Sequence, residues 1–555
     1  MNITSKPLCA YRIVYPTDAL PGLRRAAETL SAFVEAAAKC PLAVVPDTEP
    51  PYPCEVILGI TSRDTEAVAA ARTEVVDDGF AILAEGTRVF VTAPTVRGVV
   101  YGVYALLEDY FGVRFCSSRY QALHPEKIRD IPGNLRRIEN PGFMSRDTFW
   151  FDVLNPAEES AVDFPCACRS NHGAMPHVGG GVSYAGNFVH TLPDLAGTAH
   201  EPGVQPCLTD ETVFETVRTN VRKWLDENPT AKIISVSQND SYAEQQGCQC
   251  EACRAIDERE GTPMGSLLTF VNRIADDIQD DYPDVWVDTL AYRYTRKAPK
   301  TIKPAKNVII RLCSIECCFS HPLDDPACPQ NAAFVRDIEE WSAICKHLYI
   351  WDYTTDFLCY LSPFPNLGVL RQNVKFFKDH NVIGVFEQGN YQSYSGEFGE
   401  LRAYLLAKLL WNPDMTEDEY DAHMDEFLSD YYGPGWRFVR QYIDETTALA
   451  ATRHLHIYDW PNAILPAADG EASTLAAHYV SLWNEALAAA TDDAKLAHVR
   501  QSRIQALYYA TFTPGYPANT LPELHAAIRE SGITHFREGG LVPAELDPQN
   551  LPDLH

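Results

Sequence analysis

The sequence predicts an α/β protein built around a (β/α)8 TIM-like barrel, preceded by a small α+β domain and followed by a helical region. Three observations support this prediction. Strand-like apolar runs alternate with amphipathic helical patterns over residues 140–412. Residues 1–135 contain a hairpin pattern among helices, and residues 413–555 show helical spacing only. In addition, 555 residues exceed what a single hydrophobic core usually holds.

The first 135 residues combine both kinds of secondary structure. Thr17–Lys39 and Arg97–Tyr110 have the apolar spacing of helices, and Glu55–Ile60 is typical of a strand. Gly79–Ala84 and Arg88–Ala93 flank a short polar turn, which predicts a hairpin. The polar residues of this region do not converge on a recognisable catalytic set, so a catalytic site is expected elsewhere.

The barrel prediction rests on up to eight strand candidates, of which the first three are weak. Helical patterns between them would supply the crossovers, which are right-handed by default. The strand candidates are residues 143–149, a stretch around Phe188, and residues 205–209, 232–240, 285–292, 307–316, 347–353 and 382–389.

The last region shows no strand pattern. Its predicted helices are Tyr420–Tyr432, Trp436–Leu449, Thr474–Ala490 and Asp493–Ala510. We expect them to pack on the barrel.

The amino-acid composition indicates which classes of binding partner are unsuited to this chain. The net charge of −29 argues against nucleic acid and anionic membrane, because both require clustered Lys and Arg. No apolar run approaches the ~18 residues of a membrane span. The N-terminus lacks a signal-peptide pattern, which predicts a cytoplasmic protein, although a removed leader would leave the same pattern. The sixteen scattered cysteines are expected to be mostly free, buried thiols.

The stretch Lys232–Asp240 combines a buried strand pattern with an abrupt polar end. Carboxyl ends of barrel strands carry the catalytic groups of this fold, so the residues that end each strand form the candidate site. Acids, amides and aromatic rings suit carbohydrate binding, and no phosphate-binding loop or nucleophile elbow occurs. These residues are Arg146, Asp147, His172, Asn239, Asp240, Tyr292, Glu316, Trp351, Asp352, Glu387 and Gln388. His190, which lies in a long glycine-rich passage between His172 and Asn239, is a further candidate.

Several long motifs occur in order along the barrel region. They are SVSQND at 235–240, CQCEAC at 248–253, DTLAYRYTRK at 288–297, RLCSIECCFSHPL at 311–323, YIWDY at 349–353 and GVFEQGNYQSYSGEFGELRAYLLAKLLW at 384–411. Together they resemble glycoside hydrolase family 163 over roughly residues 140–430. The resemblance implies a retaining endo-β-N-acetylglucosaminidase acting on N-glycans. The segment RGVVYGVYALLEDYFGVRF at 97–115 resembles the non-catalytic N-terminal domain of hexosaminidase family 20 and glucuronidase family 67.

The adjacent pair Asn239 and Asp240 suits substrate-assisted catalysis. In that mechanism the 2-acetamido oxygen of the sugar is the nucleophile, and the enzyme supplies an acid and an acetamide partner. By analogy, Asp240 is assigned as acid/base and Asn239 as the acetamide partner. In a rival two-carboxylate mechanism Glu316 and Glu387 would serve as acid/base and nucleophile. Asp240 could also be only an N-cap, and Glu316 only structural.

Other positions are expected to contact the sugar rather than react with it. They are Arg146, His172, His190, Tyr292, Trp351, Asp352 and Gln388. Trp351 and Tyr292 could instead pack in the barrel core, and the histidines could be hydrogen-bonded loop residues.

Cys248, Cys250 and Cys253 have a spacing compatible with a structural zinc site, with Cys317, Cys318 or a histidine as fourth ligand. A buried cluster of free thiols is the alternative. No cofactor is required for the predicted reaction.

Two other functions remain open from the sequence. One is an exo-acting hexosaminidase or a glucuronidase on the same scaffold, where Arg146, Arg293 or Arg311 would bind a uronic acid. The other is a non-catalytic glycan-binding protein.

Overall fold

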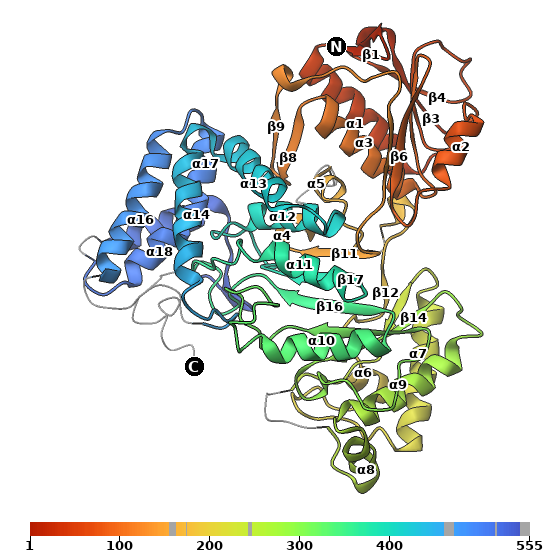
Figure 1. Cartoon of the computed structure of the whole chain (residues 1–555), viewed down its shortest axis with the longest axis vertical. Coiled ribbons are helices and arrows are strands. Elements are labelled where there is room, and N and C mark those ends of the chain that lie inside the picture. Colours follow the sequence, from red (N-terminus) through yellow and green to blue (C-terminus); the bar gives the residue numbers. More distant parts are fainter. Residues whose placement is uncertain (155–162, 174, 242–246, 460–470, 517–518, 544–555) are drawn as a thin grey trace.

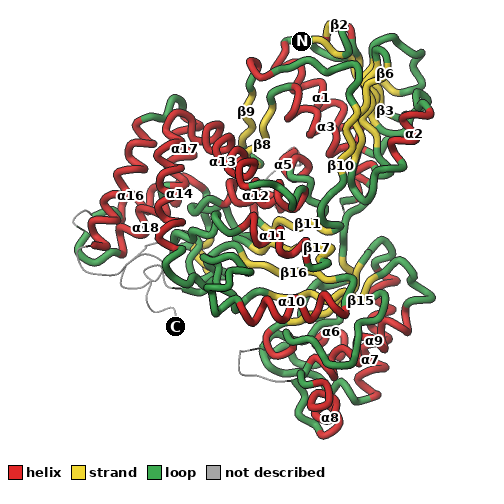
Figure 2. The backbone as a smooth tube through the Cα atoms, viewed as in Figure 1, coloured by secondary structure: helices red, strands yellow, loops and turns green. Residues whose placement is uncertain are grey.

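The computed structural model describes residues 1–154, 163–173, 175–241, 247–459, 471–516 and 519–543. Two sheets organise the chain, one in the N-terminal part and one in the middle, and the helical part lies beside the second (Figures 1 and 2). Among the described helices, none is both long and apolar enough to cross a bilayer.

The N-terminal part is a six-stranded sheet with helices on both faces. Its strand order is β10-β6-β7-β5-β3-β4, and β6 and β7 form the expected hairpin. Helices α1 and α3 cover one face and α2 the other (Figure 1). The elements are β3 (Arg12–Tyr15), α1 (Pro21–Ala38), β4 (Ala43–Pro46), β5 (Glu55–Leu58), α2 (Glu66–Arg72), β6 (Phe80–Glu85), β7 (Arg88–Thr92), α3 (Val96–Tyr110), β8 (Val113–Ser117), β9 (Tyr120–Leu123) and β10 (Arg136–Glu139). The short strands β1 (Asn2–Ile3) and β2 (Lys6–Pro7) precede them.

The central sheet has seven parallel strands in the order β11-β17-β16-β15-β14-β13-β12. The first strand pairs with the last, as in a barrel. The strands are β11 (Ser145–Phe149), β12 (Tyr184–Ala185), β13 (Ile233–Ser235), β14 (Trp286–Ala291), β15 (Val308–Cys313), β16 (Leu348–Tyr353) and β17 (Val382–Gln388). The helices of this part are α4 (Phe151–Leu154), α5 (Asp163–Ala167), α6 (Leu192–Ala196), α7 (Glu211–Glu227), α8 (Glu251–Glu260), α9 (Met264–Ile278), α10 (Ala332–Ile344), α11 (Leu370–Asp379) and α12 (Gly399–Trp411).

An eighth strand is reduced to a single bridge. His172 bridges Val182 just before β12, and the N–H of Asn171 lies 3.4 Å from the carbonyl oxygen of Arg146 in β11. Residues 171–173 therefore occupy the gap between the two edge strands without forming a ladder. The expected strand at residues 205–209 is absent, because this segment is a loop leading into α7.

The remaining elements are helical except for one small hairpin. They are α13 (Glu417–Tyr432), α14 (Trp436–Ala450), α16 (Glu471–Ala488), α17 (Asp493–Ser502), α18 (Ile504–Phe512) and α19 (Leu521–Ser531), followed by β18 (His535–Arg537) and β19 (Gly540–Leu541). The hairpin of β18 and β19 was not expected from the sequence.

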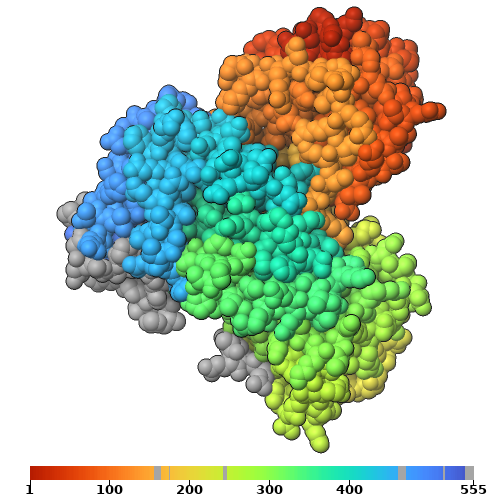
Figure 3. Space-filling model, in the orientation of Figure 1, coloured from red at the N-terminus to blue at the C-terminus, as the bar shows by residue number. Residues whose placement is uncertain are grey.

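One hydrophobic core runs through all three parts. Buried residues from Ile3 in the N-terminal part to Ala510 in α18 belong to a single packed cluster. Phe80 of the first sheet stacks on Trp411 of α12 with ring centroids 5.9 Å apart. In the space-filling view the N-terminal part forms a lobe that rests on the barrel (Figure 3).

Alternation along the strands decides which side chains enter the barrel. Asp147, Phe149, Trp351, Tyr353, Phe386 and Gln388 share the interior face. Arg146, Asp352 and Glu387 occupy the intervening positions and point outward. Gly389 follows β17 directly, and a Cβ there would lie 2.0 Å from the Trp150 ring, so the close packing requires glycine.

Candidate active site

A cleft of about 320 Å³ opens at the carboxyl ends of the central strands. Four of its residues, Phe149, Cys313, Tyr353 and Gln388, are the last residues of β11, β15, β16 and β17. This is the end of a parallel barrel that carries active sites. The remaining lining residues are Phe188, Val189, His190, Asp240, Leu290, Tyr292, Ile315, Trp351, Phe386, Tyr391, Tyr458 and Glu538.

Asp240 contributes a carboxylate to this cleft. Its side chain is 51% exposed, and Oδ1 accepts hydrogen bonds from the Ser241 N–H at 2.8 Å and the Tyr292 hydroxyl at 3.3 Å. The same hydroxyl accepts a hydrogen bond from Nε of Arg293 at 2.6 Å. The carboxylate is therefore oriented by two donors while one side remains open to the cleft.

His190 faces the same carboxylate. Its Nδ1 lies 2.8 Å from the carbonyl oxygen of Gln238, which can only accept, so Nδ1 carries the hydrogen. Nε2 lies 4.0 Å from Oδ1 of Asp240. His190 and Arg293 both have left-handed backbones, with φ of 54° and 50°. Such strain in non-glycine residues concentrates at functional sites.

The second carboxylate of the cleft comes from the far end of the chain. Glu538 lies in the turn between β18 and β19, and its N–H donates to the carbonyl oxygen of Phe357 at 3.0 Å. Gln388 donates from Nε2 to Oε1 of Glu538 at 3.1 Å, and Tyr391 makes a further hydrogen bond to this carboxyl group. Burial raises the pKa of Glu538, and the nearby charge of Asp240 adds to the effect.

Aromatic rings form the walls and floor. Phe188 and Trp351 stack with centroids 5.7 Å apart, and Phe149 contacts Phe386 at 4.7 Å. Nε1 of Trp351 donates to Oε1 of Gln388 at 2.8 Å, which fixes the indole. Apolar walls with a few directed polar groups are typical of small-ligand sites.

A buried ion pair lies beneath the aromatic floor. Arg311 precedes Cys313 by two residues on the same face of β15, and its Nη2 lies 2.9 Å from Oδ2 of Asp288. Five aromatic rings surround the guanidinium with centroids within 6.0 Å. Nη2 of Arg311 is paired with Asp288 and the Arg311 side chain is only 3% exposed, so Arg311 lies beneath the ring layer and does not line the cleft.

Five of the predicted site residues lie in the cleft: Asp240, His190, Tyr292, Trp351 and Gln388. His172 lies beside it, where its ring contacts Phe149 and its Nδ1 pairs with Asp147 at 2.6 Å. Asp147 raises the pKa of His172.

Arg146 and Asn239 do not reach the cleft. The Arg146 side chain points outward, is 2% exposed and pairs with Asp78 of the N-terminal part at 2.9 Å. Nδ2 of Asn239 donates to the carbonyl oxygens of Glu201 and Val204, and Oδ1 accepts from the N–H of Asp240. The hydrogen bonds of Asn239 therefore hold the loop, and its expected role as acetamide partner stays a prediction that this geometry does not support.

Glu316, Asp352 and Glu387 are also absent from the lining of the cleft. Glu316 lies in the turn after β15, 42% exposed, and pairs with Arg296 at 2.8 Å. Asp352 and Glu387 are register neighbours on the outer face of β16 and β17. Burial and mutual repulsion raise the pKa of Glu387, and burial raises the pKa of Asp352 to about 6. Neither Glu316 nor Glu387 lines the cleft, so the geometry lends no support to the expected two-carboxylate site, which stays a prediction.

Sequence reasoning missed Glu538, Tyr391 and Tyr458. The dipeptide Gly539-Gly540 between two short stretches is a hairpin signal, but nothing local shows that this turn reaches the barrel mouth. Phe149 and Phe188 fell within predicted strands without being recognised as cleft walls.

Among the residues that the structure describes, two groups of side chains could hold a metal ion. One is Cys207, Cys248, Cys250 and Cys253, which adds Cys207 to the three expected cysteines; the other is Cys318, His321, Cys328 and His454. Neither group includes a cleft residue. Cys9 and Cys40 form a disulfide, and the other fourteen cysteines are not disulfide-bonded.

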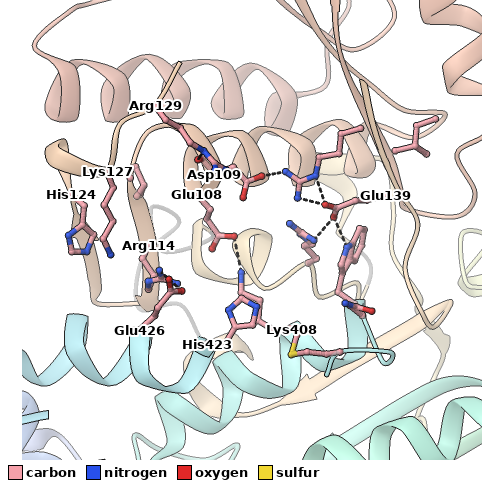
Figure 4. A pocket seen from close by; sticks show the side chains of 18 of the residues that line it. Glu108, Asp109, Arg114, His124, Lys127, Arg129, Glu139, Lys408, His423 and Glu426 are labelled. Carbon is pink, nitrogen blue, oxygen red and sulfur yellow. Dashed lines mark hydrogen bonds and ion pairs between the residues drawn. The ribbon is translucent and has the colours of Figure 1, made fainter. Parts of the chain in front are cut away.

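A larger cavity of about 720 Å³ lies between the N-terminal part and helices α12 and α13, beside Trp411 at the end of α12 (Figure 4). Its charged groups pair with one another, as Lys408 does with Glu108 and Arg169 with Glu139, at 2.8 and 2.9 Å. Paired charges between α3 and α12–α13 indicate a contact between the N-terminal part and the barrel rather than a reactive site.

Residues 118–444 match the family described as Domain of unknown function (DUF4838). This segment is more than half of the chain. The chain belongs to the DUF4838 family. The DUF4838 segment spans the whole central sheet but ends before Tyr458 and Glu538, so the cleft also uses residues beyond it. Among curated proteins, none matches this sequence.

Solved structures show the fold at low sequence identity. The family GH115 4-O-methyl-α-glucuronidase BtGH115A, with specificity for decorated arabinogalactans, is 10% identical, with a TM-score of 0.59 over 94% of this chain and 76% of that chain. A GH138 enzyme targeting pectin rhamnogalacturonan II is 11% identical, with a TM-score of 0.43 over 94% and 91%. CpGH84D is 9% identical, with a TM-score of 0.43 over 95% and 90%. The first likeness supports a TIM-like barrel for this DUF4838 protein, and the other two are too distant to carry an argument.

Proposed function

We propose that the protein is a glycoside hydrolase whose catalytic carboxyl groups are Asp240 and Glu538. The observation that supports this is their presence in one aromatic-walled cleft at the carboxyl ends of the barrel strands. Glycosidases use a pair of carboxyl groups held in different protonation states. Burial favours the protonated form of Glu538, which suits a general acid.

The proposed substrate is a β-linked N-acetylglucosamine within an N-glycan, cleaved by an endo-acting, retaining reaction. This finer assignment is supported by the motif resemblance to glycoside hydrolase family 163. Glu538 donates its proton to the leaving oxygen as the bond from that oxygen to the anomeric carbon breaks. The acetamide oxygen forms the new bond to this carbon, and Asp240 holds the acetamide N–H. Water then opens the intermediate and returns a proton to Glu538.

The roles of the two carboxyl groups differ from the assignment made from sequence. Asp240 was expected to be the acid and Asn239 the acetamide partner. The Asn239 amide donates its hydrogen bonds to the carbonyl oxygens of Glu201 and Val204. Glu538 supplies a carboxyl group with a raised pKa. We therefore assign the acid to Glu538 and the acetamide-orienting carboxylate to Asp240.

A uronic acid is a poorer candidate substrate. Its carboxylate needs a cationic partner, and no Lys or Arg occurs among the described residues that line the cleft. Arg311 is buried beneath the aromatic floor and paired with Asp288, while Arg146 lies outside the barrel.

The experiment that tests the function is a substrate panel. The purified protein is incubated with complex and high-mannose N-glycans, chitobiosides, aryl β-N-acetylglucosaminides and aryl β-glucuronides, and products are identified by mass. We expect cleavage within the chitobiose core of N-glycans and none in the Asp240→Asn, Glu538→Gln double variant. Release of glucuronic acid alone, or no release from any substrate, would contradict the proposal.

A further inference from the structure

Four side chains from two distant segments meet next to the loop that follows β15. Cys318, His321 and Cys328 lie in this loop, and His454 follows α14. One ligand atom from each lies within 4.8 Å of the other three. Sγ of Cys318 is 3.1 Å from Nδ1 of His321, and Sγ of Cys328 is 3.8 Å from Nδ1 of His454.

The 3.8 Å separation matches an edge of a zinc tetrahedron, and the 3.1 Å separation is a few tenths of an ångström shorter than such an edge. Zinc bonds of about 2.0–2.1 Å to nitrogen and about 2.3 Å to sulfur place neighbouring ligand atoms roughly 3.3–3.8 Å apart. Two cysteines and two histidines are one of the common ligand sets of structural zinc sites. Thiols and imidazoles offer one another only weak hydrogen bonds, so an ion better explains why all four converge.

The second ring nitrogen of His321 is held as a zinc ligand requires. Nε2 lies 3.0 Å from the carbonyl oxygen of Ala451, which can only accept a hydrogen bond. Nε2 therefore carries the hydrogen and leaves the lone pair on Nδ1, which faces Cys318. Hydrogen bonds of this kind fix the tautomer of metal-binding histidines.

Asn331, which is not one of the four ligands, fixes the backbone of the loop that carries Cys318 and His321. Asn331 is fully buried, and its Oδ1 accepts from the N–H of Cys318 at 2.8 Å. Its Nδ2 donates to the carbonyl oxygens of Cys318 and His321 at 3.2 and 3.3 Å. The backbone positions of Cys318 and His321 are therefore fixed before any ion binds.

We propose that Cys318, His321, Cys328 and His454 bind a structural zinc ion that ties residues 451–459 to the barrel. Backbone hydrogen bonds also connect this segment to the barrel. The N–H of Phe319 donates to the carbonyl oxygen of Leu455, and the N–H of Phe357 donates to that of Ile457, both at 2.8 Å. Tyr458 follows directly and lines the cleft. With four protein ligands the ion has no open position for catalysis, so its effect on the cleft is to hold the wall that carries Tyr458.

A second zinc site is supported independently by the four-cysteine group. Sγ of Cys207 lies 3.7 Å from that of Cys250 and 4.0 Å from that of Cys253. Sγ of Cys250 also accepts a hydrogen bond from the N–H of Cys253 at 3.4 Å, at the start of α8. This group completes the cluster of Cys248, Cys250 and Cys253 with Cys207 from the segment before α7.

Metal analysis of the full chain tests both sites. Protein purified without chelators or added metal is measured by inductively coupled plasma mass spectrometry. We expect two zinc ions per chain in the wild type, one in His454→Ala, one in Cys207→Ser and none in the double variant. Cys345→Ser, which removes a buried cysteine outside both groups, is the matched control and should keep both ions.

The outcomes separate the two proposals. Folded wild-type protein without zinc, or with iron instead, would overturn both. A His454→Ala protein that keeps two zinc ions would overturn the two-cysteine, two-histidine site, and a Cys207→Ser protein that keeps two would overturn the other. As a second readout, chelator treatment should lower the Tm of the wild type more than that of the double variant.

Discussion

Nε2 of Gln388 donates a hydrogen bond to Oε1 of Glu538 over 3.1 Å, joining the end of β17 to a hairpin 150 residues later in the chain. Oε1 of the same Gln388 amide accepts from Nε1 of Trp351, so one side chain links an aromatic wall to a carboxyl group. The barrel alone therefore supplies only one of the two cleft carboxylates, and the C-terminal hairpin completes the candidate active site.

Removing the Gln388 hydrogen bond should raise the pKa of Glu538 further. The donor favours the charged carboxylate, and the bond is lost in Gln388→Met. Because a general acid must be protonated, activity falls as pH rises through its pKa. We expect the alkaline limb of the kcat/KM profile to move to higher pH in the variant. The exposed Gln372→Met is the control, and an unchanged limb in Gln388→Met would contradict the role of Glu538.

Loosening the hairpin should reduce activity without unfolding the barrel. Phe536 is 6% exposed and packs with Leu361, Ile504 and Ile533 in a separate apolar cluster. Truncating a buried Phe to Ala costs about 3–5 kcal/mol where the site cannot collapse. In Phe536→Ala we expect at least a tenfold loss of kcat/KM and faster amide hydrogen exchange across residues 533–541. Leu541→Ala, at a 67% exposed position of the same hairpin, should change neither.

Glu387→Gln should change the pH dependence of stability and leave catalysis intact. Burial and the Asp352 charge raise the pKa of Glu387 above its unfolded value, so its stabilising contribution is full at acid pH and lost as pH rises through the raised pKa. We expect the Tm of the wild type to fall more steeply between pH 5 and 8 than that of the variant. The exposed Glu339→Gln is the control. A large loss of kcat in Glu387→Gln would return this residue to the catalytic set.

Arg146→Met should destabilise the protein without altering the active site. The change leaves the buried Asp78 with Arg97 as its remaining ion-pair partner. Breaking a buried ion pair lowers the free energy of unfolding by about 3–5 kcal/mol. Because Arg97 still pairs with Asp78, we expect a loss at the lower end of this range. Urea titration should show the lower free energy of unfolding. Adding Asp78→Asn to the Arg146→Met protein should restore part of the lost stability. A raised KM with unchanged stability would instead indicate contact with substrate.

The central sheet could be predicted because its strands are buried on both faces. Residues 285–292, 307–316, 347–353 and 382–389 are rich in apolar, β-branched and aromatic residues, and each forms a strand within two or three residues of the expected bounds. The first strands were weak in sequence and are short in the structure, since Tyr184–Ala185 and the bridge at His172 contribute few ladder bonds. At 205–209 a short run of mixed residues gave a false strand.

The site could be predicted only in part, because a strand end does not reveal which face a side chain takes. Trp351 and Asp352 are adjacent and were both assigned to the cleft, yet alternation sends one inward and the other outward. Shifting an assignment by one residue therefore exchanges a residue that lines the cleft for one buried on the outer face of the sheet, as for Gln388 and Glu387. Glu538 could not be found locally, because its position depends on a hairpin docking against the loops after β16 and β17.

The most direct test compares leaving groups in the two carboxyl variants. Wild type, Asp240→Asn and Glu538→Gln are assayed on an N-glycan and on an aryl N-acetylglucosaminide whose phenolate leaves without protonation. General acid catalysis contributes about 10²–10⁴-fold. We predict that Glu538→Gln loses this factor on the glycan and much less on the aryl substrate, while Asp240→Asn loses activity on both. Near-wild-type rates of both variants on both substrates would contradict the account.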